Sequence, residues 1–256
     1  MGNRPKRNII LFLVEGKSDR EALRDSIQEL YYRIDENNEV FFPIIREDET
    51  ERGGDITSRI GVHPRNIEEK IYEYFLKDFF DENKIYPKDI SEIIQIVDTD
   101  GVYIPDDAVC EGVNPTGKEK LFYETKTITC PNASRVIKRN ECKRENLDYL
   151  SSLNSIKVKQ KSPRYSVYYF SCNLDHFLHN SPNLEPQKKR FLADIFAKNY
   201  IDDSQGFVNV ISGDPSAVMG MNYVESWAYI REGLNSLQRH TNLNILLDKL
   251  ISKEDE

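Results

Sequence analysis

The sequence is short of the residues on which several common kinds of site depend. It has four cysteines and four histidines in 256 residues, and no two cysteines form a CxxC pair or belong to a regular framework. We therefore expect reduced thiols in a cytoplasmic protein, with neither a disulfide scaffold nor a zinc site. The histidines form no visible Ser-His-Asp or Cys-His arrangement, so the sequence gives no sign of a nucleophilic triad.

Long hydrophobic runs are missing as well. The apolar run at residues 9–14 is too short to cross a membrane, ends in a carboxylate and lacks the small-residue cleavage pattern of a signal peptide. We therefore expect no membrane partner. The composition, with 39% hydrophobic and 30% charged residues, is typical of a globular protein that can bury a substantial core.

Positive charges are outnumbered by negative charges overall but are concentrated in one segment. The formal net charge is −8, which by itself argues against a nucleic-acid partner. Residues 117–164, however, hold twelve Lys or Arg against five Asp or Glu, a net charge of +7 that leaves −15 for the remainder. This asymmetry suits a protein whose acids hold metal and whose basic segment holds phosphate, and it equally suits a solvated surface insert.

Apolar periodicity predicts an α/β fold with a parallel sheet. Short runs rich in Ile, Val and aromatic residues predict strands at residues 9–14, 40–45, 93–97 and 165–170. Helical spacing predicts helices that begin at residues 18, 66, 173 and 187, and a further helix at residues 224–251 that is interrupted near Gly233. The alternation of strands and helices predicts right-handed crossovers between parallel strands.

The same patterns divide the chain into two parts. Residues 1–180 form the expected α/β domain, which includes a basic insertion at about residues 102–164. This stretch shows no clean periodicity, so we interpret it as a long insertion without a separate core. Residues 46–61 are polar and predict a loop. Residues 181–256 are expected to form a helical C-terminal region that caps the α/β body.

Two of the predicted strands end abruptly in acidic residues. The first run is followed by Glu15 and Asp19, and the third is followed by Asp98 and Asp100. Parallel strands deliver these side chains to the carboxyl edge of the sheet, where α/β proteins bind ligands. Any one of these acids could simply cap a helix or a loop. Paired acids after two strands favour instead a site for a hard cation such as Mg²⁺, because clustered carboxylates repel one another without one.

The two acidic motifs resemble those of the TOPRIM domain of topoisomerases, primases and OLD-like nucleases. Val14-Glu15-Gly16 resembles the Glu-Gly that ends the first TOPRIM strand, and Asp98-Thr99-Asp100 resembles the DxD motif of the family. Asp19 stands where OLD-like nucleases carry a further acid, although they more usually have Glu there. Leu174-Asp175-His176-Phe177-Leu178, after the fourth predicted strand, looks like an acidic helix start of the same branch.

The resemblance implies a TOPRIM-like sheet and a nuclease that depends on Mg²⁺ or Mn²⁺. It covers about residues 8–180, with the basic insertion outside it. It assigns catalysis to Glu15, Asp98 and Asp100, and it assigns metal binding to these three together with Asp19 and Asp175. A small free-standing TOPRIM protein is similar to the effectors of anti-phage or toxin-like systems, in which an ATPase would be a separate partner chain. The oligomeric state is left open.

The basic segment supplies the expected contacts to a nucleic-acid backbone, because Lys and Arg side chains neutralise phosphates. The candidates are Lys118, Lys120, Arg135, Lys138, Arg139, Lys143, Arg144, Lys157 and Lys159. No recognition helix or base-reading motif is evident, so DNA and RNA both stay open as substrates.

Two other interpretations use the same residues. Residues 96–102 also resemble the first motif of haloacid-dehalogenase-like phosphatases, in which Asp98 would be the nucleophile and Asp100 the general acid. Ser212-Gly213-Asp214 resembles the late acidic motif of that family. The first motif normally lies on the first strand, however, and this interpretation leaves Glu15 without a role. The other alternative is a non-enzymatic interaction module whose acidic body binds a basic partner.

Overall fold

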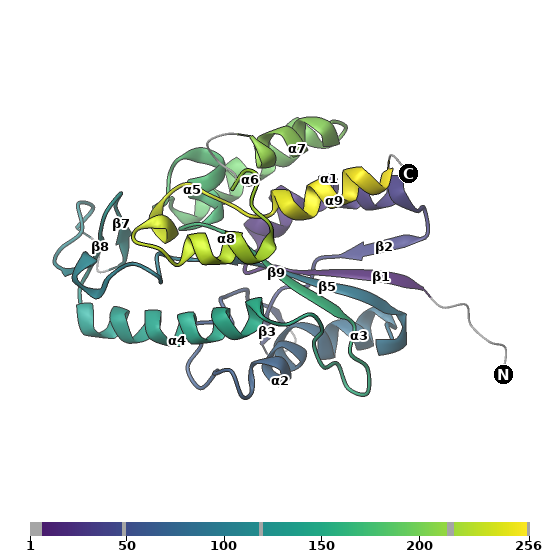
Figure 1. Ribbon diagram of the computed structural model, residues 1–256, viewed down its shortest axis with the longest axis horizontal. Helices are drawn as coiled ribbons and strands as arrows, with labels where there is room; N and C mark the ends of the chain where they lie inside the picture. The colour runs from purple at the N-terminus through teal and green to yellow at the C-terminus, as the bar shows by residue number, and fades with distance from the viewer. Residues whose placement is uncertain (1–6, 48–49, 118–119, 214–217, 255–256) are drawn as a thin grey trace.

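A parallel sheet of four strands forms the centre of the molecule. The computed structural model describes residues 7–47, 50–117, 120–213 and 218–254 of the chain. The strand order is β2-β1-β5-β9 (Figure 1). The strands are β1 (Asn8–Leu13), β2 (Asn38–Phe41), β5 (Ile90–Asp98) and β9 (Arg164–Phe170). The prediction of an α/β fold with a parallel sheet flanked by helices is confirmed.

The strands are buried on both faces, which explains their continuous apolar runs. In β1, Ile10 and Phe12 belong to the hydrophobic core on one face of the sheet. Ile9, Leu11 and Leu13 belong to the core on the opposite face. Because successive side chains of a strand point to opposite faces, a strand with helices on both sides needs apolar residues at every position.

Helices from both parts of the chain cover one face of the sheet (Figure 1). They are α1 (Lys17–Ile34), α5 (Leu174–His179), α6 (Pro186–Tyr200), α7 (Ser204–Ser212) and α9 (Asn244–Glu254). Leu23 and Ile27 of α1 share one hydrophobic cluster with Phe196, Phe207 and Leu247 of the C-terminal helices. The C-terminal helices therefore pack on the same face of the sheet as α1. Helix α7 is one that the sequence analysis did not predict.

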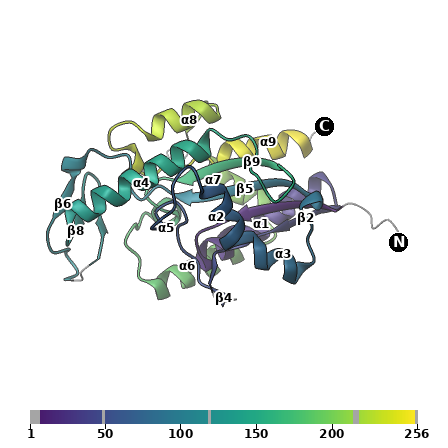
Figure 2. The same ribbon diagram turned by 90° about the horizontal axis from the view of Figure 1, so that it is seen from below.

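The opposite face is covered by α2 (Ile67–Ile71), α3 (Lys77–Asn83) and α4 (Ala133–Ser151), which Figure 2 shows from below. The helix predicted from residue 66 is present, and a π-helical turn (Tyr72–Leu76) joins α2 to α3. Ile67 and Ile71 of α2 pack into the same cluster as Leu147 of α4 and the facing residues of β1. The crossovers thus place helices on both faces of a parallel sheet, as right-handed connections require.

Residues 102–164, interpreted from the sequence as a long insertion, contain the 19-residue helix α4 and a small sheet. Residues of both belong to a small hydrophobic cluster that also includes Cys172 and Leu237. The strands of this sheet, in the order β6-β8-β7, are β6 (Val109–Glu111), β8 (Ile128–Cys130) and β7 (Phe122–Tyr123). The buried face of α4 includes Asn140, Lys143 and Asn146. An amphipathic helix is recognised in a sequence by apolar residues at every third or fourth position, and these polar residues interrupt that pattern.

Two predicted boundaries shift for local reasons. Helix α1 begins after Gly16 and not at Ser18, because the Asp19 carboxylate accepts the Gly16 N–H at 2.8 Å and completes the N-terminal cap. Strand β2 ends at Phe41, ahead of Pro43, which has no N–H with which to extend a ladder. The predicted loop at residues 46–61 contains a short antiparallel ribbon formed by β3 (Arg46–Glu47) and β4 (Thr50–Glu51).

The helix predicted at residues 224–251 is divided into α8 (Tyr223–Ile230) and α9. Helix α8 covers the edge strand β9, because the Trp227 indole N–H and the Tyr223 hydroxyl both donate to the Val167 carbonyl, at 3.3 and 2.9 Å. Short 3-10 turns lie at Pro87–Asp89, Asp106–Ala108 and Asn235–Leu237. Within the described ranges, none of the helices combines the length and the apolar character that a membrane span requires.

The effect of substituting Leu147 on stability tests whether α4 packs against the core. Its side chain is fully buried between α4 and the sheet. We expect Leu147→Ala to lower the free energy of unfolding by about 2–5 kcal/mol, through lost burial and the cavity left behind. Glu145→Ala, at an exposed position of the same helix, should change it by less than about 0.5 kcal/mol. Urea unfolding measures both, and equal effects of the two substitutions would contradict the placement of α4.

Candidate functional site

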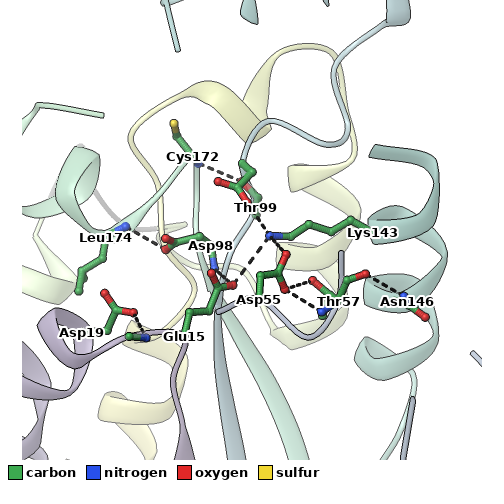
Figure 3. Close-up of polar contacts among 12 residues, drawn as sticks. Glu15, Asp19, Asp55, Thr57, Asp98, Thr99, Lys143, Asn146, Cys172 and Leu174 are labelled. Carbon is green, nitrogen blue, oxygen red and sulfur yellow. Dashed lines mark hydrogen bonds and ion pairs between the residues drawn. The ribbon is translucent and has the colours of Figure 1, made fainter. Parts of the chain in front are cut away.

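Two neighbouring strands deliver Glu15 and Asp98 to the same edge of the sheet. Strands β1 and β5 pair in parallel, Glu15 follows β1, and Asp98 is the last residue of β5. Glu15 Oε1 accepts a hydrogen bond from the backbone N–H of Asp98 at 3.1 Å. Figure 3 shows both carboxylates in the space between the strand ends, α4 and the turn that follows β9. The two motifs on which the sequence analysis relied therefore meet.

The turn after β9 adds a third acid. Asp98 Oδ1 accepts the backbone N–H of Leu174, the first residue of α5, at 3.0 Å. Asn173 caps this helix by accepting the N–H of His176 at 2.9 Å. The next residue, Asp175, is buried and pairs through Oδ2 with Nζ of Lys189 on α6, at 2.5 Å. Helix α5 is thus anchored to Asp98 and carries Asp175 to the same side of the sheet.

Asp100 lies in a turn that is hydrogen-bonded to the residues following β9. Asp100 and Cys172 both have left-handed backbones, with φ of 51° and 57°. The Asp100 N–H donates to the Cys172 carbonyl at 2.7 Å, and the Thr99 hydroxyl accepts the Cys172 N–H at 2.9 Å. Asp is among the residues that adopt this conformation most readily, so the DxD sequence suits a turn of this shape.

Both carboxylate oxygens of Asp100 have partners from the segment between β5 and β9. The Tyr123 hydroxyl donates to Oδ1 at 2.9 Å, and Lys143 Nζ donates to Oδ2 at 2.8 Å. Arg139, one turn before Lys143 on α4, donates to the Asp100 backbone carbonyl at 3.3 Å. The segment that was expected to lie outside the TOPRIM-like part therefore contributes directly to the site.

Lys143 also binds an acid that the sequence analysis did not select. Its side chain is 0% exposed, and Nζ lies 2.8 Å from Asp55 Oδ2 and 3.8 Å from Glu15 Oε1. Asp55 Oδ1 accepts the N–H of Thr57 at 2.7 Å, which orients the carboxylate toward α4 (Figure 3). Asn146 Nδ2 donates to the Thr57 carbonyl at 2.8 Å. The loop that contains Asp55 and Thr57, here called the Asp55 loop, is thus attached to α4 at two successive helical turns.

Glycine allows the Asp55 loop to approach β1 so closely. The Gly54 N–H donates to the Glu15 carbonyl at 2.7 Å. Gly53 has φ of +73°, and a Cβ at this position would lie 2.8 Å from the same carbonyl oxygen. Any other residue at position 53 would clash there. The pair Gly53-Gly54 just before an acid was the one sequence signal that could have identified Asp55.

The carboxylates fall into two groups, each with one lysine. We call Glu15, Asp55 and Asp100 the Lys143 half of the site. Asp19, Asp98 and Asp175 form the Lys189 half, in which Lys189 pairs with Asp175 and interacts electrostatically with Asp98 and Asp19. All five acids that the resemblance implied therefore lie in one site. Asp55 and Lys189 were missed because neither follows a predicted strand.

Burial dominates the electrostatics of the strand-end acids. It raises the pKa of Glu15 well above its ordinary value; Lys143 offsets part of this, and the neighbouring aspartates raise it further. Burial, followed by the charges of Asp19 and Asp100, also raises the pKa of Asp98 well above its ordinary value. The pKa of Asp19 is raised to about 6, by burial first, with Lys189 opposing the shift. For all three acids, burial therefore makes the ionised form costly, and the nearby lysines offset only part of this cost.

Asp100 is the exception. Burial would raise its pKa as well, but the charges of Lys143 and Arg139 and the hydrogen bonds from Lys143 and Tyr123 hold that pKa below its ordinary value. Burial would lower the pKa of Lys143, yet its three carboxylate partners raise it well above the ordinary range. The ion pair between Asp100 and Lys143 is therefore charged on both sides at neutral pH.

The carboxylate oxygens of the site are the right kind of ligand for a hard divalent cation, but their arrangement does not suit the binding of one. Carboxylate oxygens are the ligands that Mg²⁺ and Mn²⁺ prefer. Among the residues that the structure describes, however, no three or more acidic, histidine or cysteine side chains are grouped so that they could hold one metal ion. Glu15, Asp55, Asp100 and Asp175 are paired with lysine ammonium groups, and an ion would have to compete with these.

The residues expected to bind nucleic acid that the structure describes are spread over four places. Lys143 and Arg139 belong to the site. Arg135 and Lys138 are exposed on α4, and Arg144 on the same helix pairs with Asp106 at 3.8 Å. Lys120 pairs with Glu185 at 2.7 Å, and Lys118 lies outside the described residues. Lys157 and Lys159 are exposed in the loop that leads to the N-terminal end of β9, at the sheet edge away from the carboxylates.

The stability of an Asp19 variant tests whether the negative charge of Asp19 destabilises the folded protein. Its pKa in the folded state, about 6, lies above the unfolded value of about 3.9, so ionisation destabilises the fold as pH rises through this window. In metal-free buffer we expect Asp19→Asn to raise the free energy of unfolding by about 1–3 kcal/mol at pH 8. The gain should shrink toward zero at pH 4.5. Urea unfolding at both pH values measures this, and a loss of stability at pH 8 would show that Asp19 is well paired.

None of the known family models, curated proteins or solved structures matches this chain. Its likeness to TOPRIM proteins rests on the short motifs at Glu15 and Asp98. A fold by itself does not define an activity, so what this chain does follows only from the chemistry of its own site.

Proposed function

We propose that this protein is a nuclease that hydrolyses phosphodiester bonds of DNA or RNA with the help of Mg²⁺ or Mn²⁺. The observation that carries the proposal is the convergence of carboxylates from separate segments at the C-terminal edge of a parallel sheet. The carboxylates belong to Glu15, Asp19, Asp55, Asp98, Asp100 and Asp175. This edge is where open α/β sheets bind their ligands.

The electrostatic state of the cluster supports a cationic ligand. Glu15 and Asp98 have raised pKa values although Lys143 and Lys189 are close by. Side chains whose charge is so costly are found at functional sites more often than elsewhere. A divalent cation that binds there would supply positive charge to a phosphate and lower the pKa of a bound water.

Cationic side chains around the cluster suit a phosphodiester substrate. Arg139 and Lys143 reach Asp100 from α4, and Lys189 reaches Asp175 from α6. Such groups stabilise negative charge that develops on a phosphoryl group. Arg135 and Lys138 lie one turn or less before Arg139 and are exposed. They would contact backbone phosphates next to the site and add affinity without base specificity.

The contact between Glu15 and Asp98 favours a nuclease over the phosphatase alternative. Glu15 accepts the backbone N–H of Asp98 and shares Lys143 with Asp100. A haloacid-dehalogenase-like mechanism needs Asp98 and Asp100 but has no use for a third acid at this point. The Asp214 that suggested its late motif lies outside the described residues. The TOPRIM family, a role in anti-phage defence and a separate ATPase partner remain proposals that rest on the resemblance.

Cleavage assays with isosteric variants test the proposed activity. We expect Glu15→Gln and Asp98→Asn each to lower metal-dependent cleavage at least about 100-fold, because each removes a charge from the reacting centre. Asp107→Asn, at an exposed position, should leave cleavage unchanged. Supercoiled plasmid, single-stranded DNA and total tRNA are incubated with Mg²⁺ or Mn²⁺, and the products are followed by electrophoresis.

Two outcomes of this assay would reject the proposal. Wild-type cleavage by both variants would show that the carboxylates are not the active site. Hydrolysis of a small phosphomonoester that is lost in Asp98→Asn but kept in Glu15→Gln would instead identify the phosphatase mechanism.

The placement of the basic residues predicts which of them bind substrate. In a Glu15→Gln background, we expect Arg135→Gln with Lys138→Gln to weaken binding of a labelled oligonucleotide and to reduce the salt slope of log K by about 1–2. Lys157→Gln with Lys159→Gln removes the same charge at the opposite sheet edge and should have less effect on both quantities. Fluorescence anisotropy over a range of salt concentrations measures them. Equal effects of the two pairs would indicate binding driven by overall charge.

A further inference from the structure

Tyr123 joins the small sheet to the acidic edge of the main sheet. It is the last residue of the two-residue strand β7, and its hydroxyl donates to Asp100 Oδ1 at 2.9 Å. Its ring is partly buried against the hydrophobic cluster that includes Ile128 and Val136. Tyr123 thus reaches the DxD motif from a strand that lies 23 positions away in the sequence. The sequence analysis did not select it, because a tyrosine next to a short apolar stretch carries no signal of a site.

The direction of the Asp100 carboxylate is set by its partners and not by its own backbone. The terminal torsion of an aspartate has a broad distribution, so one backbone conformation allows its two oxygens to face many directions. Two donors from different elements bind them here. The Tyr123 hydroxyl on β7 donates to Oδ1 at 2.9 Å, and Lys143 Nζ on α4 donates to Oδ2 at 2.8 Å. Because each donor binds a different oxygen, the two together fix the torsion, whereas with the lysine alone the carboxylate could turn about that contact.

The backbone of Tyr123 is held in turn by Asn183, which lies between α5 and α6. The Asn183 side-chain amide accepts the Tyr123 N–H at 2.9 Å and donates to the Tyr123 carbonyl at 2.7 Å. An amide offers both an acceptor and a donor, so it binds this residue as a further strand would. The same loop is tied to the start of α5, since Asn173 Nδ2 donates to the Pro182 carbonyl at 2.9 Å. The position of the Tyr123 hydroxyl is therefore fixed by elements beyond β7 itself.

The charge states of the two groups strengthen their contact. Burial, followed by the charge of Asp100, raises the pKa of Tyr123 well above its ordinary value, so the phenol keeps its proton at neutral pH. Burial would raise the pKa of Asp100, but Lys143 and Arg139 hold that pKa below its ordinary value, so the carboxylate is ionised. A hydrogen bond from a neutral hydroxyl to an ionised carboxylate is stronger than one between two neutral groups.

We propose that Tyr123 is a positioning residue, which holds the Asp100 carboxylate in the orientation that phosphodiester cleavage requires. This inference rests on the proposed function and deepens it, because it makes the activity depend on the small sheet between β5 and β9, outside the TOPRIM resemblance. Tyr123 acts through Asp100 and is not itself a catalytic residue. A displacement of about 1 Å at a reacting group can lower a rate by about 100-fold, so the direction of one carboxylate is enough to matter.

The kinetics of Tyr123→Phe, which removes only the hydroxyl, test the proposal. We expect kcat to fall about tenfold and KM to change by less than about twofold, because substrate binding is kept while the Asp100 carboxylate loses one of its two donors. Tyr149→Phe is the matched control: this hydroxyl, on α4, donates to the carboxylate of Glu68 at 2.6 Å. It should leave kcat and KM within about twofold of wild type. Single-stranded DNA and RNA oligonucleotides that carry a fluorophore and a quencher, in Mg²⁺ or Mn²⁺, give both constants.

A crystal structure of Tyr123→Phe tests the positioning without reference to activity. We expect the Asp100 carboxylate to have turned or to occupy more than one orientation. Strand β7 should stay in place, because the contacts of Asn183 are to its backbone. Thermal unfolding should show similar shifts for Tyr123→Phe and Tyr149→Phe, since each loses one hydrogen bond to a carboxylate. A general loss of stability would then not explain a difference in kcat.

The failure of this inference and the failure of the proposed function give different results. An unchanged kcat in Tyr123→Phe, equal losses of kcat in Tyr123→Phe and Tyr149→Phe, or a single unchanged orientation of Asp100 in the crystal would overturn the inference and leave the nuclease intact. A raised KM at unchanged kcat would do the same, because it would make Tyr123 a substrate-binding residue. No cleavage of any substrate by the wild-type chain would instead reject the proposed function, and the inference with it.

Discussion

The ion pairs of one buried lysine connect the parts of this protein that form its site. Lys143 joins the end of β1, the loop after β2 and the turn after β5 through Glu15, Asp55 and Asp100. A buried ammonium is stable only when carboxylates surround it, and buried carboxylates are stable only when a cation is near. Each group therefore requires the others, and this mutual requirement fixes the position of α4 on the sheet.

The segment between β5 and β9 is part of the site, although it lies outside the TOPRIM resemblance. Its small sheet supplies Tyr123, and its long helix supplies Arg139, Lys143 and Asn146. Tyr123, Arg139 and Lys143 bind Asp100, and Asn146 binds the carbonyls of Thr57 and Val62. In the sequence, the segment that holds them looks like a solvated basic surface. The concentration of positive charge between residues 117 and 164 thus has two uses. Part of it neutralises the acids of the body, and part is exposed on α4.

Local physical signals determined how well each feature could be predicted. The four strands and most helices were identified because both faces of the sheet are buried, which makes the strands continuously apolar. Helix α4 was missed because Asn140, Lys143 and Asn146 occupy its buried face. Glu15 and Asp98 were selected because each lies at the end of a predicted strand, and Asp175 was selected through the resemblance of residues 174–178 to an acidic helix start. Asp55 follows a loop, and Lys189 lies within a helix among other basic residues, so neither has a signal of this kind.

The sequence by itself determined the class of the fold and the edge of the sheet where the acids gather. Both follow from local rules, since strand periodicity and the parallel order of strands decide which residues reach the C-terminal edge. Only the tertiary structure decided which cations meet those acids. Lys143 lies 88 positions from Asp55 and Lys189 lies 14 positions from Asp175, yet both pairs are in contact. Such pairings depend on how helices pack on the sheet, and packing is set by the whole core at once and not by any short stretch of sequence.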